Sequence, residues 1–309
     1  MITLISPNWV SVWILLEINI LSFIPIICAS KRNQETEAAT KYFLVQALGS
    51  LLLLTGAIIG SQPKLYPITV IVLIIALLIK LGAFPCHFWY PSIIASLSWR
   101  NCLLLSTWQK IAPLCLLSTI RTKYPSKVLL VFAGINAIIG GFLGINQTHL
   151  RSLLAYSSIG HLGWILRIVA LNKVIVWVFY FLIYCIAVVP IFILFILTNS
   201  KTVYDLYNLH KTHFLIPIIV IIIILSLAGI PPLTGFVPKI IVIRRIIHTN
   251  FFILIILLLG SFINLYYYLN IAIASLSALS SGIKSSPIIK IIPLLILMSS
   301  AFIGIIFLI

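Results

Sequence analysis

Acidic side chains are scarce in this sequence, which has only four of them: Glu17, Glu35, Glu37 and Asp205. The five cysteines are isolated from one another and form no CxxC pair, so ligands for zinc or an iron–sulfur cluster are lacking. There is also no glycine-rich nucleotide motif after a strand and no phosphate-binding loop. These absences argue against a chain that itself binds nicotinamide, flavin or a metal.

Long apolar runs fill most of the 309 residues, of which 62% are hydrophobic and 8% charged. The mean hydropathy is +1.24. The runs are continuous rather than alternating, which argues against a β-barrel, and a helix satisfies its backbone polar groups within its own segment. The sequence therefore predicts an all-α polytopic membrane protein. About ten transmembrane segments are expected, at residues 8–28, 40–59, 67–84, 99–120, 126–145, 152–170, 174–197, 214–247, 251–273 and 287–309.

Basic residues outnumber acidic ones by 20 to four, which gives a formal net charge of +16. They are scattered over short loops and helix ends, without a patch of interleaved aromatic residues, so nucleic acid is not the expected partner. Phospholipid headgroups and acidic surfaces of neighbouring subunits fit this distribution better. The two faces of the membrane receive similar numbers of basic residues, so the positive-inside rule does not fix the orientation.

Three lysines lie inside apolar runs: Lys80 ends PITVIVLIIALLIK, Lys110 lies within CLLLSTWQKIAPLCLLSTI, and Lys239 ends LAGIPPLTGFVPK. Glu17 lies in the middle of SVWILLEINILSFIP. An ammonium at the bilayer centre costs about 2.5–3.5 kcal/mol on a lenient insertion scale, so such groups face a protein interior or a wet cavity. These four groups predict a mid-membrane path for protons. The alternatives are snorkelling to the interface for Lys80, an ordinary helix-end lysine for Lys239, and a purely structural ion pair with Glu17 for Lys110.

A second polar group lies in the segment LLAYSSIGHLGW. His161 follows Tyr156 and Ser157 by less than two turns of a helix. A neutral histidine among hydroxyl groups can relay protons near pH 7. We assign these three residues to a secondary proton path, and the alternative for His161 is a packing histidine with satisfied hydrogen bonds.

Glycine and proline interrupt two apolar runs beside a lysine, in KLGAFP at 80–85 and in GIPPLTGFVPK at 229–239. Pro85 cannot donate a backbone hydrogen bond, and the run at 214–247 is too long for one crossing. Both runs are therefore predicted to be discontinuous helices. The segment 85–98 is expected to be re-entrant or interfacial, because it is too short to span a bilayer.

The two interrupted runs are five predicted spans apart, so the halves that contain them would have opposite orientations across the membrane. Paired interruptions of this kind indicate inverted repeats with a transfer site at mid-membrane. We predict a single membrane domain over residues 1–309. It would comprise a first half-repeat at 1–120, a second repeat at 121–275 and a C-terminal helix at 276–309.

Six motifs between Leu15 and Lys239 occur in one order: LLEINILSFIP, EAATKYFLVQALGS, KLGAFPCHFWYP, LLLSTWQKIAP, GGFLGINQTHLRSLLAYSSIGHLGW and LSLAGIPPLTGFVPK. In them the chain resembles the antiporter-like membrane subunits of respiratory complex I, a family related to subunits of multi-subunit sodium/proton antiporters. The resemblance implies two inverted repeats, each with one broken helix, around a hydrated polar axis. The first repeat is expected to lack its leading helix, because only sixteen residues precede Glu17.

By motif position, the resemblance assigns proton transfer to four residues: Glu17, Lys80, Lys110 and Lys239. It implies a membrane-arm subunit of mitochondrial complex I that takes part in proton translocation coupled to NADH oxidation and ubiquinone reduction. The chain would belong to an enzyme, the proton-translocating NADH:ubiquinone reductase, without a redox centre of its own. NADH, flavin, iron–sulfur clusters and ubiquinone would act in other subunits.

The resemblance also implies partners and a location. The partners would be other membrane-arm subunits, including neighbouring antiporter-like chains, together with membrane phospholipids. The location would be the mitochondrial inner membrane, with the chain crossing it many times. Two other functions stay open, a stand-alone or multi-subunit cation/proton antiporter subunit and a structural scaffold of the membrane arm.

Overall fold

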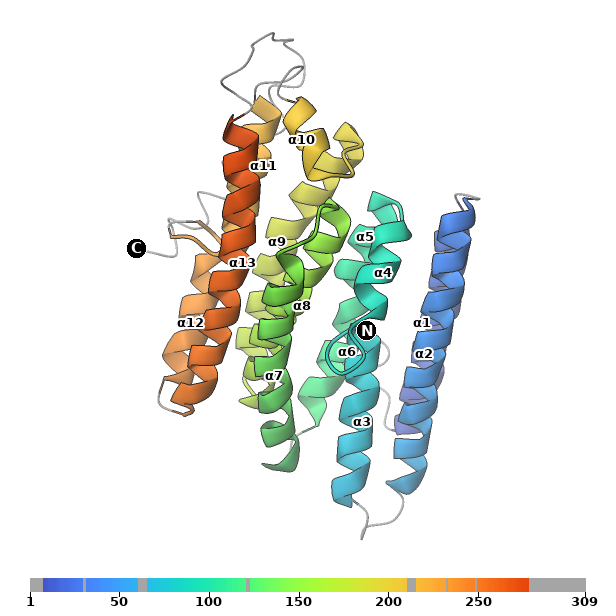
Figure 1. Cartoon of the computed structure of the whole chain (residues 1–309). Coiled ribbons are helices and arrows are strands. Elements are labelled where there is room, and N and C mark those ends of the chain that lie inside the picture. Colours follow the sequence, from blue (N-terminus) through green and yellow to red (C-terminus); the bar gives the residue numbers. More distant parts are fainter. Residues whose placement is uncertain are drawn as a thin grey trace. The chain divides into compact units, whose positions relative to one another are not determined.

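The structure is a computed structural model that describes residues 8–29, 32–60, 66–120, 123–209, 215–231, 233–247 and 249–277. Over these ranges the chain is helical, with one isolated β-bridge between His149 and Thr202 and no strand (Figure 1). The helices are α1 (Trp9–Cys28), α2 (Asn33–Ile59), α3 (Tyr66–Leu81), α4 (Trp89–Ser96), α5 (Trp99–Ser106), α6 (Trp108–Thr119), α7 (Lys123–Gly144), α8 (Leu150–Ala170), α9 (Val174–Thr198), α10 (Val203–Leu209), α11 (Leu215–Ala228), α12 (Phe236–Ile246) and α13 (Phe251–Ser277).

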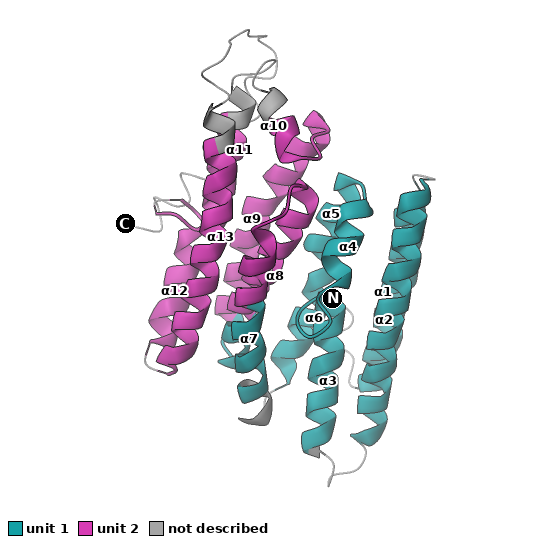
Figure 2. Ribbon diagram, viewed as in Figure 1, with its two compact units in different colours: residues 1–136, 166–174 teal, residues 137–165, 175–309 magenta. Residues whose placement is uncertain are grey.

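The chain forms two compact units, which Figure 2 colours separately. Unit 1 comprises Met1–Asn136 and Leu166–Val174, and unit 2 comprises Ala137–Ile165 and Ile175–Ile309. In unit 1, α2 packs against α1, α3 and α4, and α6 packs against α3 and α5. In unit 2, α13 packs against α10, α11 and α12. The repeat boundaries expected at residues 120 and 275 stay a prediction.

Membrane-spanning helices account for most of the described chain, which confirms the all-α polytopic class. Six of the described helices have spanning length and apolar composition: Trp9–Cys28, Asn33–Ile59, Lys127–Gly144, Leu150–Ala170, Val174–Thr198 and Phe251–Ile273. Two shorter apolar helices cover Pro67–Leu81 and Ile218–Ala228. The expected segment at 287–309, like the C-terminal helix at 276–309 beyond Ser277, lies outside the described residues.

Helix α1 illustrates how a spanning helix buries one side in the protein and exposes the other. Its buried residues, Val12, Leu16, Ile20, Phe23 and Ile27, recur every three or four positions and so form one stripe. The opposite side is also apolar but exposed, with Ile18 56% and Leu21 57% exposed. A helix that is apolar on both sides suits a position between a protein core and lipid.

Two predicted helices have different bounds in the structure. The run expected at 40–59 begins at Asn33, because the acidic stretch before it is also helical and Lys41 pairs with Glu37 one turn earlier at 2.6 Å. The run expected as one helix at 99–120 is two, α5 and α6, which meet at Thr107. The Thr107 hydroxyl donates to the Leu103 carbonyl at 2.7 Å, and its backbone has φ −113° and ψ −73°.

Both expected discontinuous helices are confirmed. The first, here called the Lys80 break, is the non-helical segment 82–88 between α3 and α4, where Gly82 has φ +68°. The second, the Lys239 break, lies between α11 and α12 and includes residues 229–231 and 233–235, where Gly229 has φ +82°. Left-handed backbone of this kind is populated readily only by glycine, which explains why both interruptions contain one. The segment expected to be re-entrant contains the eight-residue helix α4.

Candidate functional site

Lys80 lies in the last turn of α3, directly before the first break, and is 7% exposed. Its Nζ donates to the backbone carbonyl of Gln46 on α2 at 3.4 Å. The Gln46 side-chain amide donates in return to the Lys80 carbonyl at 3.3 Å. The C-terminal end of a helix carries partial negative charge, so α3 favours a cation here. The Lys80 ammonium is therefore held inside the protein and does not snorkel to a membrane face.

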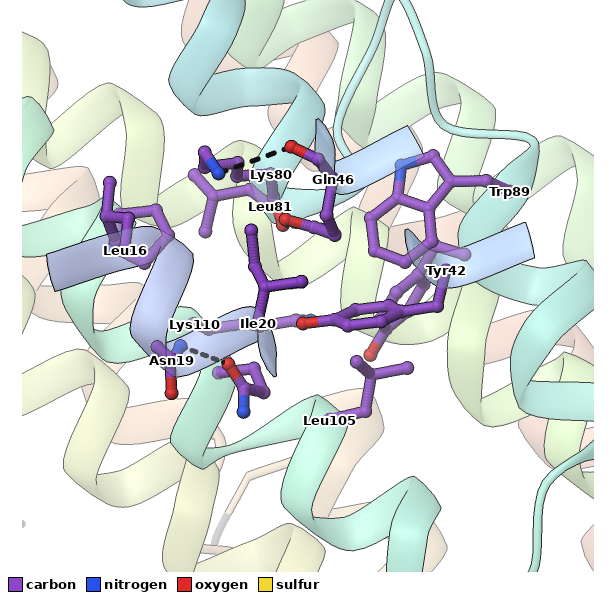
Figure 3. A pocket seen from close by; sticks show the side chains of 13 residues that line it. Leu16, Asn19, Ile20, Tyr42, Gln46, Lys80, Leu81, Trp89, Leu105 and Lys110 are labelled. Atoms are coloured by element: carbon purple, nitrogen blue, oxygen red, sulfur yellow. Dashed lines mark hydrogen bonds between the residues drawn. The ribbon is translucent and has the colours of Figure 1, made fainter. Parts of the chain in front are cut away.

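Lys80 and Lys110 line the same cavity in unit 1, which encloses about 380 Å³ of atom-free space including its open side. The cavity has polar walls, to which Asn19, Tyr42 and Gln109 contribute. Asn19 Nδ2 donates to Gln109 Oε1 at 2.6 Å, which ties α1 to α6. Figure 3 shows the side chains gathered around the cavity, with the Lys80–Gln46 and Asn19–Gln109 contacts as dashed lines. Two predicted proton carriers thus share one small polar space.

Lys110 lies on α6 and is 3% exposed. Its Nζ lies 4.5 Å from the centroid of the Tyr90 ring, a cation–π contact of about 0.5–2 kcal/mol. Tyr90 is on α4, just after the Lys80 break, and is itself 1% exposed. From the sequence, only Glu17 was predicted as a structural partner for this ammonium, and the aromatic ring was not. The aromatic run HFWY in the motif KLGAFPCHFWYP was the available signal.

Glu17 is partly exposed on α1 and does not line the cavity. Its carboxylate forms no ion pair within 4 Å with another described residue, but it is near enough to Lys80 to favour that ammonium electrostatically. Unit 1 therefore contains three of the four predicted carriers, of which Lys80 and Lys110 line one cavity and Glu17 lies outside it. The fourth, Lys239, belongs to unit 2.

Asn136 of α7 holds the non-helical backbone of the Lys80 break. Its Oδ1 accepts a hydrogen bond from the Phe84 backbone N–H at 2.9 Å, and its Nδ2 donates to the Phe132 carbonyl at 2.7 Å. The side chain is fully buried. A buried backbone N–H without a helical partner needs an acceptor, and Asn136 supplies it. This residue was not predicted from the sequence.

Lys239 lies on α12, the helix that follows the second break, and is 6% exposed. Its Nζ donates to the carbonyl of Ala228, the last residue of α11, at 2.6 Å. That carbonyl is left without a helical partner because α11 ends there. A Cβ at Gly229 would lie 2.9 Å from Lys239 Nζ, so the lysine lies tightly against the left-handed turn.

His161 is 7% exposed, and its Nδ1 is hydrogen-bonded to the Tyr180 hydroxyl of α9 at 3.1 Å. The Tyr184 ring lies against it, with centroids 5.3 Å apart. These side chains line a cavity with about 220 Å³ of atom-free space, its open side included, whose wall also contains Pro238, the neighbour of Lys239. His161 thus lies near the second break, beside two tyrosines that were not predicted from the sequence.

The other two residues of the predicted secondary path lie elsewhere on α8. Tyr156 is partly exposed and does not line this cavity. Ser157 is 3% exposed, and its hydroxyl donates to the Leu154 carbonyl at 2.8 Å. Within the described ranges no group of three or more histidine, cysteine, aspartate or glutamate residues could hold a metal ion.

Comparisons with known proteins give consistent results. The family described as NADH:quinone oxidoreductase/Mrp antiporter, TM, matches residues 6–64 and 58–264. NADH-ubiquinone oxidoreductase chain 2 of Lumbricus terrestris is 43% identical over 276 residues, which cover 88% of this chain and 82% of that protein. The protein of the same name from Oryctolagus cuniculus is 36% identical over 287 residues, 89% of this chain and 82% of that one.

Solved structures share the fold. A chain of respiratory complex I from Thermus thermophilus matches with a TM-score of 0.82 and 24% identity over 98% of this chain and 73% of that chain. A chain of the membrane-bound sulfane sulfur reductase, an archaeal respiratory membrane complex, matches with a TM-score of 0.85 and 19% identity, over 97% and 69% of the two chains. The Mrp complex from Dietzia gives a TM-score of 0.70 and 20% identity, over 91% and 58%.

Proposed function

The chain belongs to the NADH:quinone oxidoreductase/Mrp antiporter family, and we propose that it is a membrane-arm subunit of mitochondrial complex I that takes part in proton translocation. Curated relatives that share most of their length with it are named NADH-ubiquinone oxidoreductase chain 2, and its helices suit a multi-pass membrane protein. Because these relatives come from animals, the mitochondrial inner membrane is the proposed location.

The proposed energy source is NADH oxidation and ubiquinone reduction. The electron carriers, namely flavin, iron–sulfur clusters and ubiquinone, would act in other subunits. Its partners would be those membrane-arm subunits, including neighbouring antiporter-like chains, and phospholipids. This chain would contribute proton-binding side chains alone.

One observation carries this proposal. At each helix break there is a buried lysine whose ammonium donates a hydrogen bond to a backbone carbonyl. Lys80 contacts the Gln46 carbonyl and Lys239 the Ala228 carbonyl. An ammonium held in this way releases its proton to a nearby acceptor when the local electrostatic field changes, because burial penalises the charged form. Such a site binds a proton in one state of the complex and releases it in another.

The cavity of unit 1 supplies a physical means of coupling. Lys80 and Lys110 face the same space, so a proton on one disfavours a proton on the other by like-charge repulsion. The carboxylate of Glu17 favours the charged form of Lys80, and the Tyr90 ring favours that of Lys110. A change in the position of either partner would therefore move a proton between the two amines.

The test is lysine replacement in the assembled complex, reconstituted into liposomes. Lys80→Met and Lys239→Met keep the length and apolar stem of the side chain and remove the proton-binding amine. Both variants should assemble and lose most of the protons moved per NADH oxidised. Lys173→Met is the matched control, because Lys173 is exposed at a helix end. Unchanged stoichiometry in both break variants would exclude proton transfer through these amines.

A second candidate function, cation/proton exchange, is favoured by the Mrp antiporter part of the family description. It predicts that the purified chain alone exchanges cations for protons across a liposome membrane. A third, a structural scaffold, predicts that neutral replacements of Glu17, Lys80, Lys110 and Lys239 all leave coupling intact. Proton flux measured in these two experiments separates the three functions.

A further inference from the structure

A polar cluster between α8 and α13 of unit 2 lies outside both helix breaks. It comprises Ser157, Asn264, Tyr267 and Tyr268, which are 3%, 6%, 2% and 0% exposed, and is here called the tyrosine cluster. Asn264 precedes the two tyrosines by three and four residues, so the three side chains share one face of α13. The two rings pack together, with centroids 4.5 Å apart. None of the α13 residues was selected from the sequence.

The polar atoms of this cluster are incompletely satisfied. In the described part of the chain, the Tyr267 and Tyr268 hydroxyls and Asn264 Oδ1 are buried without a hydrogen-bond partner. The two phenol hydroxyls interact with each other and with Ser157, but none of these contacts has the geometry of a direct hydrogen bond, and the Ser157 hydroxyl donates its own proton to the Leu154 carbonyl. Buried hydroxyl groups nearly always have a partner in protein or ordered water. The cluster therefore presents acceptors and donors for a small polar ligand.

The tyrosine cluster lies next to the His161 site along α8. Ser157 precedes His161 by four residues and therefore lies on the same side of the helix, one turn closer to the end at Leu150. Asn264 approaches the same turn, because a Cβ at Gly160 would lie 2.6 Å from its Nδ2. The cluster thus occupies the stretch between His161 and the membrane face at which α8 begins.

We propose that the tyrosine cluster binds water and relays protons between His161 and the membrane face at which α8 begins. Each phenol hydroxyl accepts a proton on its oxygen while it donates its own, so no phenol changes charge and each O–H rotates back after a transfer, whereas Ser157 offers only its oxygen as an acceptor. Asn264 has an amide, which does not titrate, and orients the relay through its Oδ1. This inference rests on the proposed proton translocation and assigns it a route through unit 2.

Three consecutive tyrosines provide the test, because Tyr266 is 55% exposed while its two neighbours are buried. Tyr267→Phe and Tyr268→Phe remove one hydroxyl each and keep the ring packing, and Tyr266→Phe is the matched control. The rate of proton translocation into liposomes should fall about tenfold in each buried variant, less than the 10²–10⁴ of a directly acting acid–base group. It should be unchanged in Tyr266→Phe. Ser157→Ala, which leaves both rings, serves if a phenylalanine variant fails to assemble.

The outcomes separate this inference from the proposed function. If the buried variants translocate protons as fast as Tyr266→Phe while Lys239→Met does not, the cluster is only packing and the inference is wrong. If Lys80→Met and Lys239→Met both translocate normally, the proposed function itself fails. A loss in the lysine variants and in the buried tyrosine variants, but in neither control, supports both.

Discussion

At the Lys80 break the lysine belongs to the helix that precedes the interruption, whereas at the Lys239 break it belongs to the helix that follows. Both ammoniums nevertheless donate to a backbone carbonyl. Lys80 is in the last turn of α3, and Lys239 reaches back to the final carbonyl of α11 at 2.6 Å. The shared feature is a carbonyl oxygen that accepts a hydrogen bond from a buried ammonium, which favours its charged form.

The side chains around Lys80 differ from those around Lys239, although both lysines lie beside a left-handed glycine. Lys80 shares its cavity with a second amine, Lys110, and feels the charge of Glu17. The cavity beside the Lys239 break is lined by His161 and two tyrosines, whose ring nitrogens and hydroxyls can donate or accept hydrogen bonds. The first break is therefore suited to coupling between charges, and the second to passing a proton to a relay.

The largest effect should come from adding one methyl group at the first break. Gly82→Ala forces alanine into φ +68° and places its Cβ 2.7 Å from the Tyr90 Cβ, which cannot move without α4. We expect a loss of about 2–5 kcal/mol, from the left-handed backbone and the overpacked contact together. Thermal inactivation of the assembled complex measures it.

The same change at the second break should affect function more than stability. Gly229→Ala has the left-handed strain of about 1–2 kcal/mol, but its Cβ meets the flexible end of Lys239 at 2.9 Å. The lysine can move away, which takes its ammonium off the Ala228 carbonyl. Proton translocation should then fall while the complex stays assembled. Equal stability losses at both glycines, with equal activity, would contradict the contrast.

A smaller effect is expected from Asn136, which holds the first break from α7. Asn136→Leu leaves the buried Phe84 N–H without its acceptor and should destabilise the complex by about 1–3 kcal/mol. Asn270→Leu is the control, because Asn270 is exposed on α13. Thermal inactivation at matched protein concentration reports both. A loss no greater than that of the control would mean that the break does not depend on this hydrogen bond.

The cation–π contact of Lys110 gives a smaller and more specific effect. Tyr90→Leu removes a stabilisation of about 0.5–2 kcal/mol from the ammonium, whereas Tyr90→Phe keeps the ring. The rate of proton translocation should therefore change in the leucine variant and stay near that of the unmodified protein in the phenylalanine variant. Equal rates for all three proteins would show that proton transfer does not depend on the ring.

The helix breaks and their lysines could be predicted from the sequence. Glycine and proline interrupt a helix, and a lysine within an apolar run is expected to face the protein interior. The class of protein, both interruptions and the three lysines followed from local patterns. The division of the 99–120 run at Thr107 did not, since no glycine or proline marks it and the helix ends through a hydroxyl bonded to the Leu103 carbonyl.

Contacts between distant residues were also out of reach. Tyr90 and Lys110 are twenty residues apart and meet only because α4 and α6 are placed by the break between α3 and α4. Similarly, three consecutive tyrosines on α13 look alike in the sequence, and only helix packing buries Tyr267 and Tyr268 while it exposes Tyr266. The spacing of apolar residues predicts which face of a helix is buried, but it does not predict which other helix packs against that face.

The smallest effect concerns Asp205, a carboxylate at the start of α10, outside the spanning helices. Partial burial acts to raise the pKa of Asp205, but hydrogen bonds from the backbone N–H groups of Thr202 and Lys201, at 2.8 and 2.7 Å, hold it below its ordinary value. Thr202 Oγ1 accepts from the Asp205 N–H in return, as in a capping box. Because the folded pKa is lowered, this stabilisation is complete above the unfolded value of about 4 and is lost as the pH falls through the folded pKa.

Asp205→Ala should therefore weaken α10 by about 1 kcal/mol at pH 7, which speeds hydrogen exchange of its amides about fivefold. The difference between variant and unmodified protein should shrink as the pH falls below about 4. Comparing the two proteins at each pH cancels the intrinsic exchange rate. A difference that persists in acid would mean that the cap does not depend on the ionised carboxylate. Lysine amines do not change protonation near pH 4. A change in hydrogen exchange in that range can therefore be assigned to Asp205 and not to the lysines at the breaks.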